Sequence, residues 1–247
     1  MIKFFGRIRH KLLSENKVSK YILYAIGEIF LVVIGILIAL QINNWNEERK
    51  AKSKTIIYVN KIINDLENDL RNLDSLYIIG NTNRQQAANY FEKFENQKGI
   101  PLINRIKTSK VTVSEMSKFR YTPIDYTFRD MQSSGNSTLL SEDQRNAMIK
   151  LSNTQDFTLI VLEKDILDIM DEESKSRSLL DHDRSVSEFF ENIGVERDQN
   201  TLAQGLLYQH NVISLYDNLG ENINWLGERI KKETKVAIDL LKNTNTP

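Results

Sequence analysis

The chain contains no cysteine, and its 247 residues include only three prolines and ten glycines. Without cysteine the protein has no disulfide, no thiol nucleophile and no thiolate metal site. The internal prolines, Pro101 and Pro123, leave long uninterrupted stretches on either side. Proline ends or kinks a helix, so stretches that lack it favour helical structure. Composition therefore excludes thiol chemistry and favours a helical chain.

Catalytic motifs are also missing. The sequence has no Gly-rich phosphate loop, no His-Glu-x-x-His pair and no Gly-x-Ser-x-Gly turn. Its histidines are His10, His182 and His210, and neither of the last two follows a Glu at the spacing of di-iron bundles. His182 lies between two aspartates, but no second ligand cluster is near it, so we expect a solvated loop. We predict no enzyme, no metal and no cofactor.

The most acidic stretch of the chain lies within a predicted helix. Its composition resembles that of a calcium site, but helical spacing spreads the carboxylates over an exposed face. We therefore expect a solvated helix face. The residues are Glu163, Asp165, Asp168, Asp171, Glu172 and Glu173.

One long apolar stretch, Tyr21 to Ile42, carries a single charge, Glu28, and no proline. At about 1.5 Å per residue its helix is roughly 33 Å long, enough to cross a hydrocarbon core of about 30 Å. The alternative, a cleaved signal peptide, has a shorter apolar core and a small-residue cleavage site, which the exit at Leu40–Asn44 does not offer. We predict a retained transmembrane helix over residues 21–43.

The flanking charges predict the orientation of this helix. Residues 1–20 form a basic tail with six Lys/Arg against one acid, whereas residues 43–60 contain four Lys/Arg. Positive charge stays on the cytoplasmic side, so we expect the N-terminus inside and the remaining chain outside. Without the tail and Glu28, the net charge of the remaining chain is −4 (0 − 5 + 1). A mildly acidic domain argues against nucleic acid as a partner.

Glu28 is costly inside a membrane, by about 2.5–3.5 kcal/mol on insertion scales. Gly35 and Ala39 share its helix face, and small residues allow two membrane helices to approach closely. We predict that these three residues contact another helix. Three interpretations of Glu28 stay open: a neutral acid bonded between helices, a group that reaches the interface, or a proton carrier.

The remaining chain predicts a linker helix over 44–55 and a helical bundle over 56–247. Apolar residues at heptad spacing indicate one helix that ends at Gly80, and a second is expected over 82–94. The final helix is expected over about 201–242, also with heptad spacing. The predicted core residues are Ile56, Val59, Ile63, Leu66, Leu70, Leu73, Leu219, Ile223, Leu226 and Ile230.

The middle of the chain predicts shorter elements. Residues 99–123 are expected to be irregular, with a possible strand at 110–113. Thr122-Pro123 with Asp125 in the first turn predicts a helix start, and the Ser133–Asn136 turn predicts its end. A long helix begins after Ser141, where Gln144 completes a capping box. A polar break over 174–187 and a short turn at Phe189-Phe190 follow it. The predicted fold is all-α: a transmembrane helix, then an extracytoplasmic antiparallel bundle of four long, heptad-patterned helices.

Three segments resemble the N-terminus of a large uncharacterised family of single-span proteins, abundant in Bacteroidota and described as a domain of unknown function. These are Lys11–Tyr21, Tyr24–Glu28 and Val33–Glu47, and the Ser133–Asn136 turn is similar to that family's mid-domain motif. The resemblance implies a bacterial inner-membrane anchor, a helical periplasmic domain and a motif role for Glu28. It implies no activity and no catalytic residue.

Two classes of function remain. The first is a membrane-anchored, non-enzymatic interaction or sensory module that contacts the lipid bilayer and either a protein partner or a second copy. The second is an accessory subunit of an ion- or proton-coupled envelope complex that uses Glu28.

Overall fold

The computed structural model describes residues 18–96, 99–180, 192–194 and 198–243. The chain divides into two compact units, Met1–Ile57 and Tyr58–Pro247. All regular elements in the described residues are helices, which confirms the all-α prediction for them. In chain order they are α2 (Val18–Asn96), α3 (Leu102–Glu115), α4 (Tyr126–Ser133), the 3₁₀ helix η1 (Asn136–Leu139), α5 (Glu142–Leu180) and α7 (Gln199–Lys242).

The described part of the first unit consists of the N-terminal part of α2. This helix is long and apolar enough to cross a membrane, and its most apolar 18-residue window has no buried residue. The large side chains that are more than half exposed point to all sides of the helix. They include Leu23, Ile29, Phe30, Leu31, Leu37 and Leu40.

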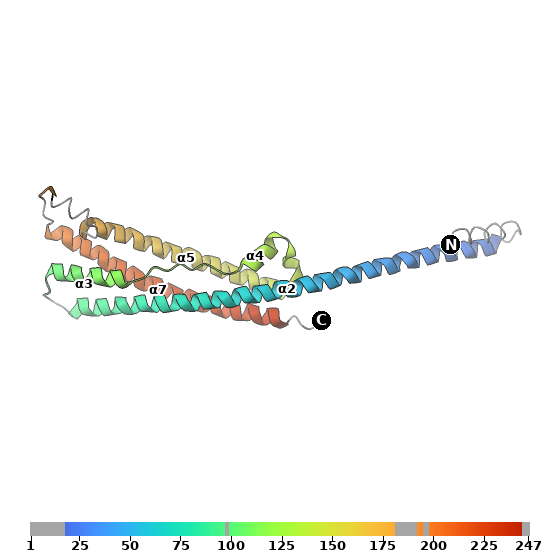
Figure 1. The fold of residues 1–247 in the computed structure, drawn as a ribbon, viewed down its shortest axis with the longest axis horizontal. Helices are drawn as coiled ribbons and strands as arrows, with labels where there is room; N and C mark the ends of the chain where they lie inside the picture. The colour runs from blue at the N-terminus through green and yellow to red at the C-terminus, as the bar shows by residue number, and fades with distance from the viewer. Residues whose placement is uncertain (1–17, 97–98, 181–191, 195–197, 244–247) are drawn as a thin grey trace. The chain divides into compact units, whose positions relative to one another are not determined.

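Three long helices, the part of α2 from Tyr58 onward, α5 and α7, form most of the second unit (Figure 1). α5 and α7 are antiparallel. Near one end Gln144 Nε2 donates to the Leu240 carbonyl at 3.0 Å, and near the other Asn211 Nδ2 donates to Glu172 Oε2 at 3.0 Å. α7 is antiparallel to α2 as well, so α2 and α5 run in the same direction.

Gly80 does not end a helix, contrary to prediction. It lies where α2 and α7 are closest: a Cβ on Gly220 would come within 2.5 Å of the Gly80 carbonyl oxygen. A Cβ on Gly80 would in turn meet Ile223 Cγ2 at 2.7 Å. Glycine therefore serves close helix packing here, and the helices predicted over 56–80 and 82–94 are both part of α2.

In the described part of the chain, no single long helix fills the fourth position of the bundle, which is occupied by α3 and an extended segment. α3 packs against α7, residues 116–125 then run without helical structure, and α4 follows. In this extended segment Phe119, Tyr121 and Pro123 are buried, whereas Arg120 and Thr122 are exposed. This alternation is typical of an extended strand, whose side chains point to opposite faces. The prediction of four long helices is therefore wrong: among the described residues α2, α5 and α7 are long, and α3 with the extended segment takes the fourth place.

Side chains of α2 take the place of a neighbouring strand along this extended segment. Asn83 Nδ2 donates to the Ser117 carbonyl at 2.8 Å, and Ser117 N–H donates to Asn83 Oδ1 at 3.0 Å. Asn72 Nδ2 donates to the Thr122 carbonyl at 3.3 Å. These amides pair with backbone groups of the extended segment, which has no neighbouring strand among the described residues.

The possible strand at 110–113 lies inside α3, so that prediction is wrong. Ile106 and Ser109, three residues apart, form the buried side of α3. The valines suggested a strand, but helical spacing of residues that pack on α7 overrode that local preference.

The N-terminus of α4 also differs from the prediction. The helix starts at Tyr126, three residues beyond Pro123, and Asp125 makes no side-chain cap. The Asp125 carboxylate instead accepts from Arg129 Nε at 2.9 and 2.8 Å. Asp65, on α2, accepts the Thr127 N–H at 2.9 Å, so another helix supplies the cap.

Two predicted boundaries are confirmed. α4 ends at Ser133, and Gly135 follows with a φ of 72°, a conformation that favours glycine. The capping box that starts α5 forms as predicted, because Gln144 N–H donates to Ser141 Oγ at 3.3 Å and Ser141 N–H donates to Gln144 Oε1 at 3.0 Å.

The predicted break over 174–187 begins too early, because α5 continues to Leu180. Its remainder and the Phe189-Phe190 turn lie in 181–191, outside the described residues. α7 begins at Gln199, where Asp198 Oδ1 accepts the Thr201 N–H at 2.8 Å.

The bundle core contains most of the predicted heptad positions. Ile63 and Leu70 are half-buried, whereas Ile56 is 57% exposed and belongs to the first unit, so its placement in the core is wrong. A heptad position is buried only where another helix packs against it. On α5 the apolar side chains of Ile160 and Leu167 are exposed as well. The buried predicted residues are Val59, Leu66, Leu73, Leu219, Ile223, Leu226 and Ile230.

Candidate functional site

The predicted membrane contact residues all lie in the first unit. Glu28 is half-exposed, Gly35 and Ala39 are exposed, and a Cβ on Gly35 would meet nothing within 4 Å. The described residues contain one helix that could cross a membrane, whereas the predicted contact requires two. Helix contact through Glu28 therefore stays a prediction.

In the second unit, Asp69 is a completely buried carboxylate that joins three elements. It accepts hydrogen bonds from Tyr121 OH at 2.9 Å, Gln155 Nε2 at 2.8 Å and Ile124 N–H at 3.1 Å. Burial raises the pKa of Asp69, and these three hydrogen bonds oppose that rise. The arrangement holds the extended segment between α2 and α5, and every bond is satisfied internally, so it favours a structural role.

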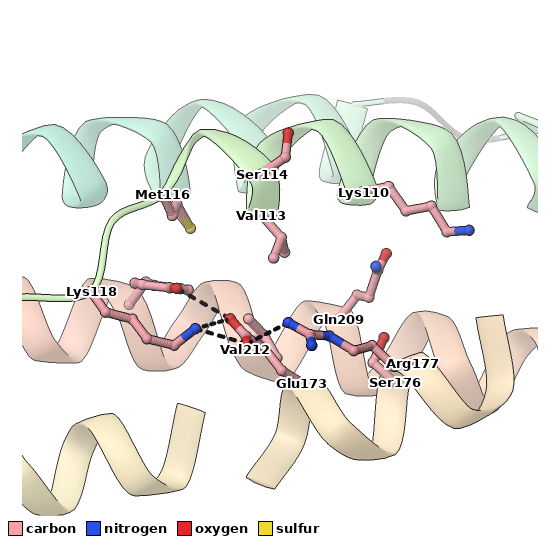
Figure 2. A pocket seen from close by; sticks show the side chains of 11 residues that line it. Lys110, Val113, Ser114, Met116, Lys118, Glu173, Ser176, Arg177, Gln209 and Val212 are labelled. Atoms are coloured by element: carbon pink, nitrogen blue, oxygen red, sulfur yellow. Dashed lines mark hydrogen bonds and ion pairs between the residues drawn. The ribbon is translucent and has the colours of Figure 1, made fainter. Parts of the chain in front are cut away.

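A cavity of about 290 Å³ lies between α3, α5 and α7 (Figure 2). The walls from α3 and α7 combine polar and apolar side chains, whereas the wall from α5 is polar. α3 and the residues that follow it supply Lys110, Val113, Ser114, Met116 and Lys118; α5 supplies Glu173, Ser176 and Arg177; α7 supplies Gln209, Val212 and Tyr216.

Glu173 is the centre of the polar wall and is 8% exposed. Lys118 Nζ lies 2.8 Å from both Glu173 carboxylate oxygens, Arg177 Nη2 lies 3.2 Å from Oε2, and Tyr216 OH donates to Oε1 at 3.2 Å (Figure 2). Burial and the neighbouring Glu173 raise the pKa of Tyr216, so its phenol is protonated at neutral pH. With Lys110, the cavity has three cations and one carboxylate, a formal charge of +2. The arrangement is suited to binding rather than to proton transfer.

A second hollow shares Lys118, Glu173 and Arg177 with this cavity and adds Met170 and Ser174. The same ion cluster therefore lines two adjoining concave surfaces. Ligand pockets typically combine apolar walls with a few well-placed polar groups, and the larger set of such groups is in the first cavity.

The acidic stretch of α5 is not uniformly solvated, so the prediction is wrong for Glu173. Lys164 Nζ lies 2.7 Å from Asp168 on the exposed surface, as expected, but Asp165 accepts from Asn222 of α7 at 2.7 Å. Among the described residues, no group of three or more His, Cys, Asp or Glu side chains could hold a metal ion. His182 lies outside them.

His210 packs among aromatic rings. The ring centroids of Tyr90, Phe91 and Phe94 lie 5.9, 5.0 and 5.4 Å from its imidazole. Its Nδ1 is buried and has no hydrogen-bond partner within the described residues. Burial lowers the pKa of His210, so this half-buried histidine favours its neutral form in the folded state.

The chain was compared with protein families, curated proteins and solved structures. A model described as a family of unknown function (DUF6090) matches residues 28–194 of the 247. The chain belongs to DUF6090. No curated protein and no solved structure matched it.

The match to DUF6090 includes two of the three walls of the cavity. It covers α3, α4 and α5 and begins at Glu28, whereas Gln209, Val212 and Tyr216 on α7 lie beyond its end. The family description assigns no activity, so the function must be argued from the site itself.

Sequence reasoning missed Asp69 and placed Glu173 on a solvated helix face. Asp65, Asp69 and Asn72 are spaced 4 and 3 along α2, which is the spacing of a second heptad stripe beside the apolar one. Polar residues that keep such spacing indicate a polar partner on that face. The spacing therefore indicated a polar contact on this face of α2. It did not indicate the partner, which is an extended segment about 50 residues later in the chain.

Proposed function

We propose that this member of DUF6090 is a membrane-anchored, non-enzymatic interaction or sensory module. The proposal includes a single pass through a bacterial inner membrane, the N-terminus in the cytoplasm and the bundle in the periplasm. The observation that supports this proposal concerns α2. One helix bears an exposed apolar segment and then, from Val59 onward, contributes to the bundle core.

The composition of α2 supports an anchor rather than a soluble helix. A helix that is apolar on every face is stable in lipid or in the core of a large protein, and the side chains of this segment are exposed. α2 is one helix that includes both the apolar segment and part of the bundle, and a shift of packed helices is a common form of switch. This is the physical basis of the proposed sensory role.

Topology is tested with a reporter fused after Pro247 that is active only outside the cytoplasm. We expect activity, whereas the same reporter fused before Met1 should be inactive. Expressed fusions with the opposite pattern would contradict the proposed orientation and leave the anchor itself intact.

The accessory-subunit function stays as a second candidate because Glu28 is the one charged residue between Tyr21 and Ile42. Purification of the full chain in mild detergent with mass measurement separates the two. A homo-oligomer or a complex with a non-transporting protein favours the module. A stable complex with a multi-span protein favours the accessory subunit.

Substitution of Glu28 sharpens this distinction. If the neutral acid donates a hydrogen bond between helices, Glu28→Gln preserves association, and Glu28→Leu weakens it by about 0.6–2 kcal/mol. If Glu28 carries protons, Gln is as damaging as Leu to the activity of the complex, because an amide does not titrate. Equal association of all three forms, measured by cross-linking, would contradict a helix contact at Glu28.

A further inference from the structure

The cavity between α3, α5 and α7 has an apolar side as well as a charged one. Val113, Met116 and Val212 line it together with the ion cluster of Glu173. Its volume of about 290 Å³ is at the lower end of ligand pockets, which begin at about 300 Å³. A ligand of this cavity is therefore small, with one apolar part and one polar part.

The charges of the cavity favour an anion. Glu173 balances one of the three cations, and the side chains of Lys118 and Arg177 are 35% and 64% exposed. Both cationic groups therefore remain accessible from solvent while they contact Glu173. A cleft with an excess of one charge concentrates ligands of the opposite charge.

Ser176 provides an independent observation. It lines the cavity and is 2% exposed, yet its Oγ has no hydrogen-bond partner within the described residues. Other hydroxyls on these helices donate to a preceding carbonyl, as Thr158 does to Thr154 at 2.8 Å and Ser178 does to Lys175 at 2.7 Å. A buried hydroxyl without a partner is unfavourable, and an acceptor atom placed in the cavity would give it one.

We propose that this cavity binds a small organic carboxylate. Its carboxylate accepts from Ser176 Oγ and is attracted by Lys118 and Arg177, and its alkyl part lies on Val113, Met116 and Val212. This inference specifies the sensory role proposed above by naming the ligand class. It rests on the second unit alone, so loss of membrane association would contradict the proposed function and leave binding unchanged.

The test uses the full chain in detergent micelles with ¹³C-methyl methionine. Of the five methionines, Met116 lines the cavity, whereas Met131 and Met148 are buried elsewhere in the core. Hexanoate should shift the Met116 methyl resonance saturably and leave the other two unchanged. Hexanamide, a neutral molecule of the same shape, and inorganic phosphate, an anion without an alkyl part, should have little effect.

Each other result overturns the proposal. No saturable shift of Met116 with hexanoate excludes the site, and an equal effect of hexanamide shows that charge is not recognised. An equal effect of phosphate shows that the apolar wall is not used. A shift of Met116, Met131 and Met148 together indicates partition of hexanoate into the micelle or a general change of the protein.

Two variants assign the groups. Arg177→Gln should raise the Kd for hexanoate about tenfold, because it removes one of the two solvent-accessible cations that attract the carboxylate. Arg229→Gln is the matched control: Arg229 also pairs with a Glu one turn away, at 3.3 Å, but does not line this cavity. Equal effects of the two variants would overturn the assignment.

Ser176→Ala separates a binding role from a structural one. The hydroxyl makes no bond within the described residues, so its removal should leave the melting temperature without hexanoate unchanged or raised. The Kd for hexanoate should rise about three- to tenfold. An unchanged Kd would overturn the role of Ser176 in the site.

Discussion

The two parts of α2 are the clearest contrast in this protein. Before Ile57 the helix exposes large apolar side chains in every direction, as Leu31 and Leu37 illustrate. From Val59 onward the same helix buries one stripe and exposes charged and polar residues elsewhere. Helix propensity does not distinguish the two parts. The distribution of apolar residues around the helix axis does, because it determines which surroundings each part requires.

The contrast extends to glycine. Gly35 in the first part has open space around it, whereas Gly80 in the second is in close contact with Gly220 of α7. The same residue type therefore has no close neighbour within the chain in one region and a close backbone contact in the other. The following predictions test this contrast, beginning with the largest effect.

Leu66→Asp and Ile223→Asp should each prevent folding of the bundle. The side chains of Leu66 and Ile223 are 0% exposed. A buried unpaired charge costs several kcal/mol, whereas the total free energy of unfolding of a domain is about 5–15 kcal/mol. We expect loss of cooperative thermal unfolding in the full chain, measured by circular dichroism. Ile78→Asp, at a 70% exposed position of α2, is the control and should melt like the wild type. Normal melting of the two core variants would show that these heptad positions do not form the core.

The double substitution Leu31→Asp with Leu37→Asp should affect the membrane and not the bundle. Each charge costs about 2.5–3.5 kcal/mol in a membrane-spanning helix, roughly 5–7 for the pair. We expect the protein to be released by alkaline extraction of membranes, while the bundle keeps its melting temperature. The matched control, Leu31→Val with Leu37→Val, should remain in the membrane fraction. Retention of the Asp pair would contradict a lipid-facing segment.

Gly220→Ala should destabilise the bundle, although alanine favours a helix by about 1 kcal/mol over glycine. Its Cβ would lie 2.5 Å from the Gly80 backbone oxygen, and backbone cannot move aside as a flexible side chain can. We expect a net loss of about 1–3 kcal/mol, seen as a melting temperature several degrees lower. Gly35→Ala is the comparison in the first part and should leave the bundle transition unchanged. A more stable Gly220→Ala protein would show that α2 and α7 are farther apart.

The smallest effect concerns pH and His210. Burial lowers the pKa of His210 in the folded state, whereas the unfolded histidine titrates near about 6.5. Below that pH the unfolded chain binds the proton more readily, so stability is complete above it and declines as the pH falls. His210→Phe and His210→Gln should both reduce the difference between melting temperatures at pH 7.5 and 5.5. An unchanged difference in both variants would assign the pH dependence to other groups.

Part of this architecture was predictable because it depends on short-range patterns. The capping box at Ser141 and Gln144 and the turn at Gly135 involve residues close in sequence, so local chemistry is sufficient. The apolar run of α2 and the heptad positions Leu66 and Ile223 were predictable for the same reason, since periodicity reports which side of a helix is buried.

The remainder was decided by contacts between distant residues. Gly80 has the sequence character of a helix end, but its proximity to Gly220 gives it a packing role. Asp65 caps α4 from another helix, and Asp69 holds the extended segment against Gln155 of α5. Such bonds form between residues 60 to 90 positions apart, so no local pattern contains them.

The sequence alone determined that the chain is helical, that one segment is apolar on every face and which stripe of α7 and of the later part of α2 is buried. These properties follow from the chemistry of single side chains and their spacing along one helix. The tertiary structure decided that α3 and an extended segment together complete the bundle, and that Glu173 lies beside a cationic cavity with Ser176. A cavity exists only where three elements meet, and the position of each wall depends on the packing of the other two.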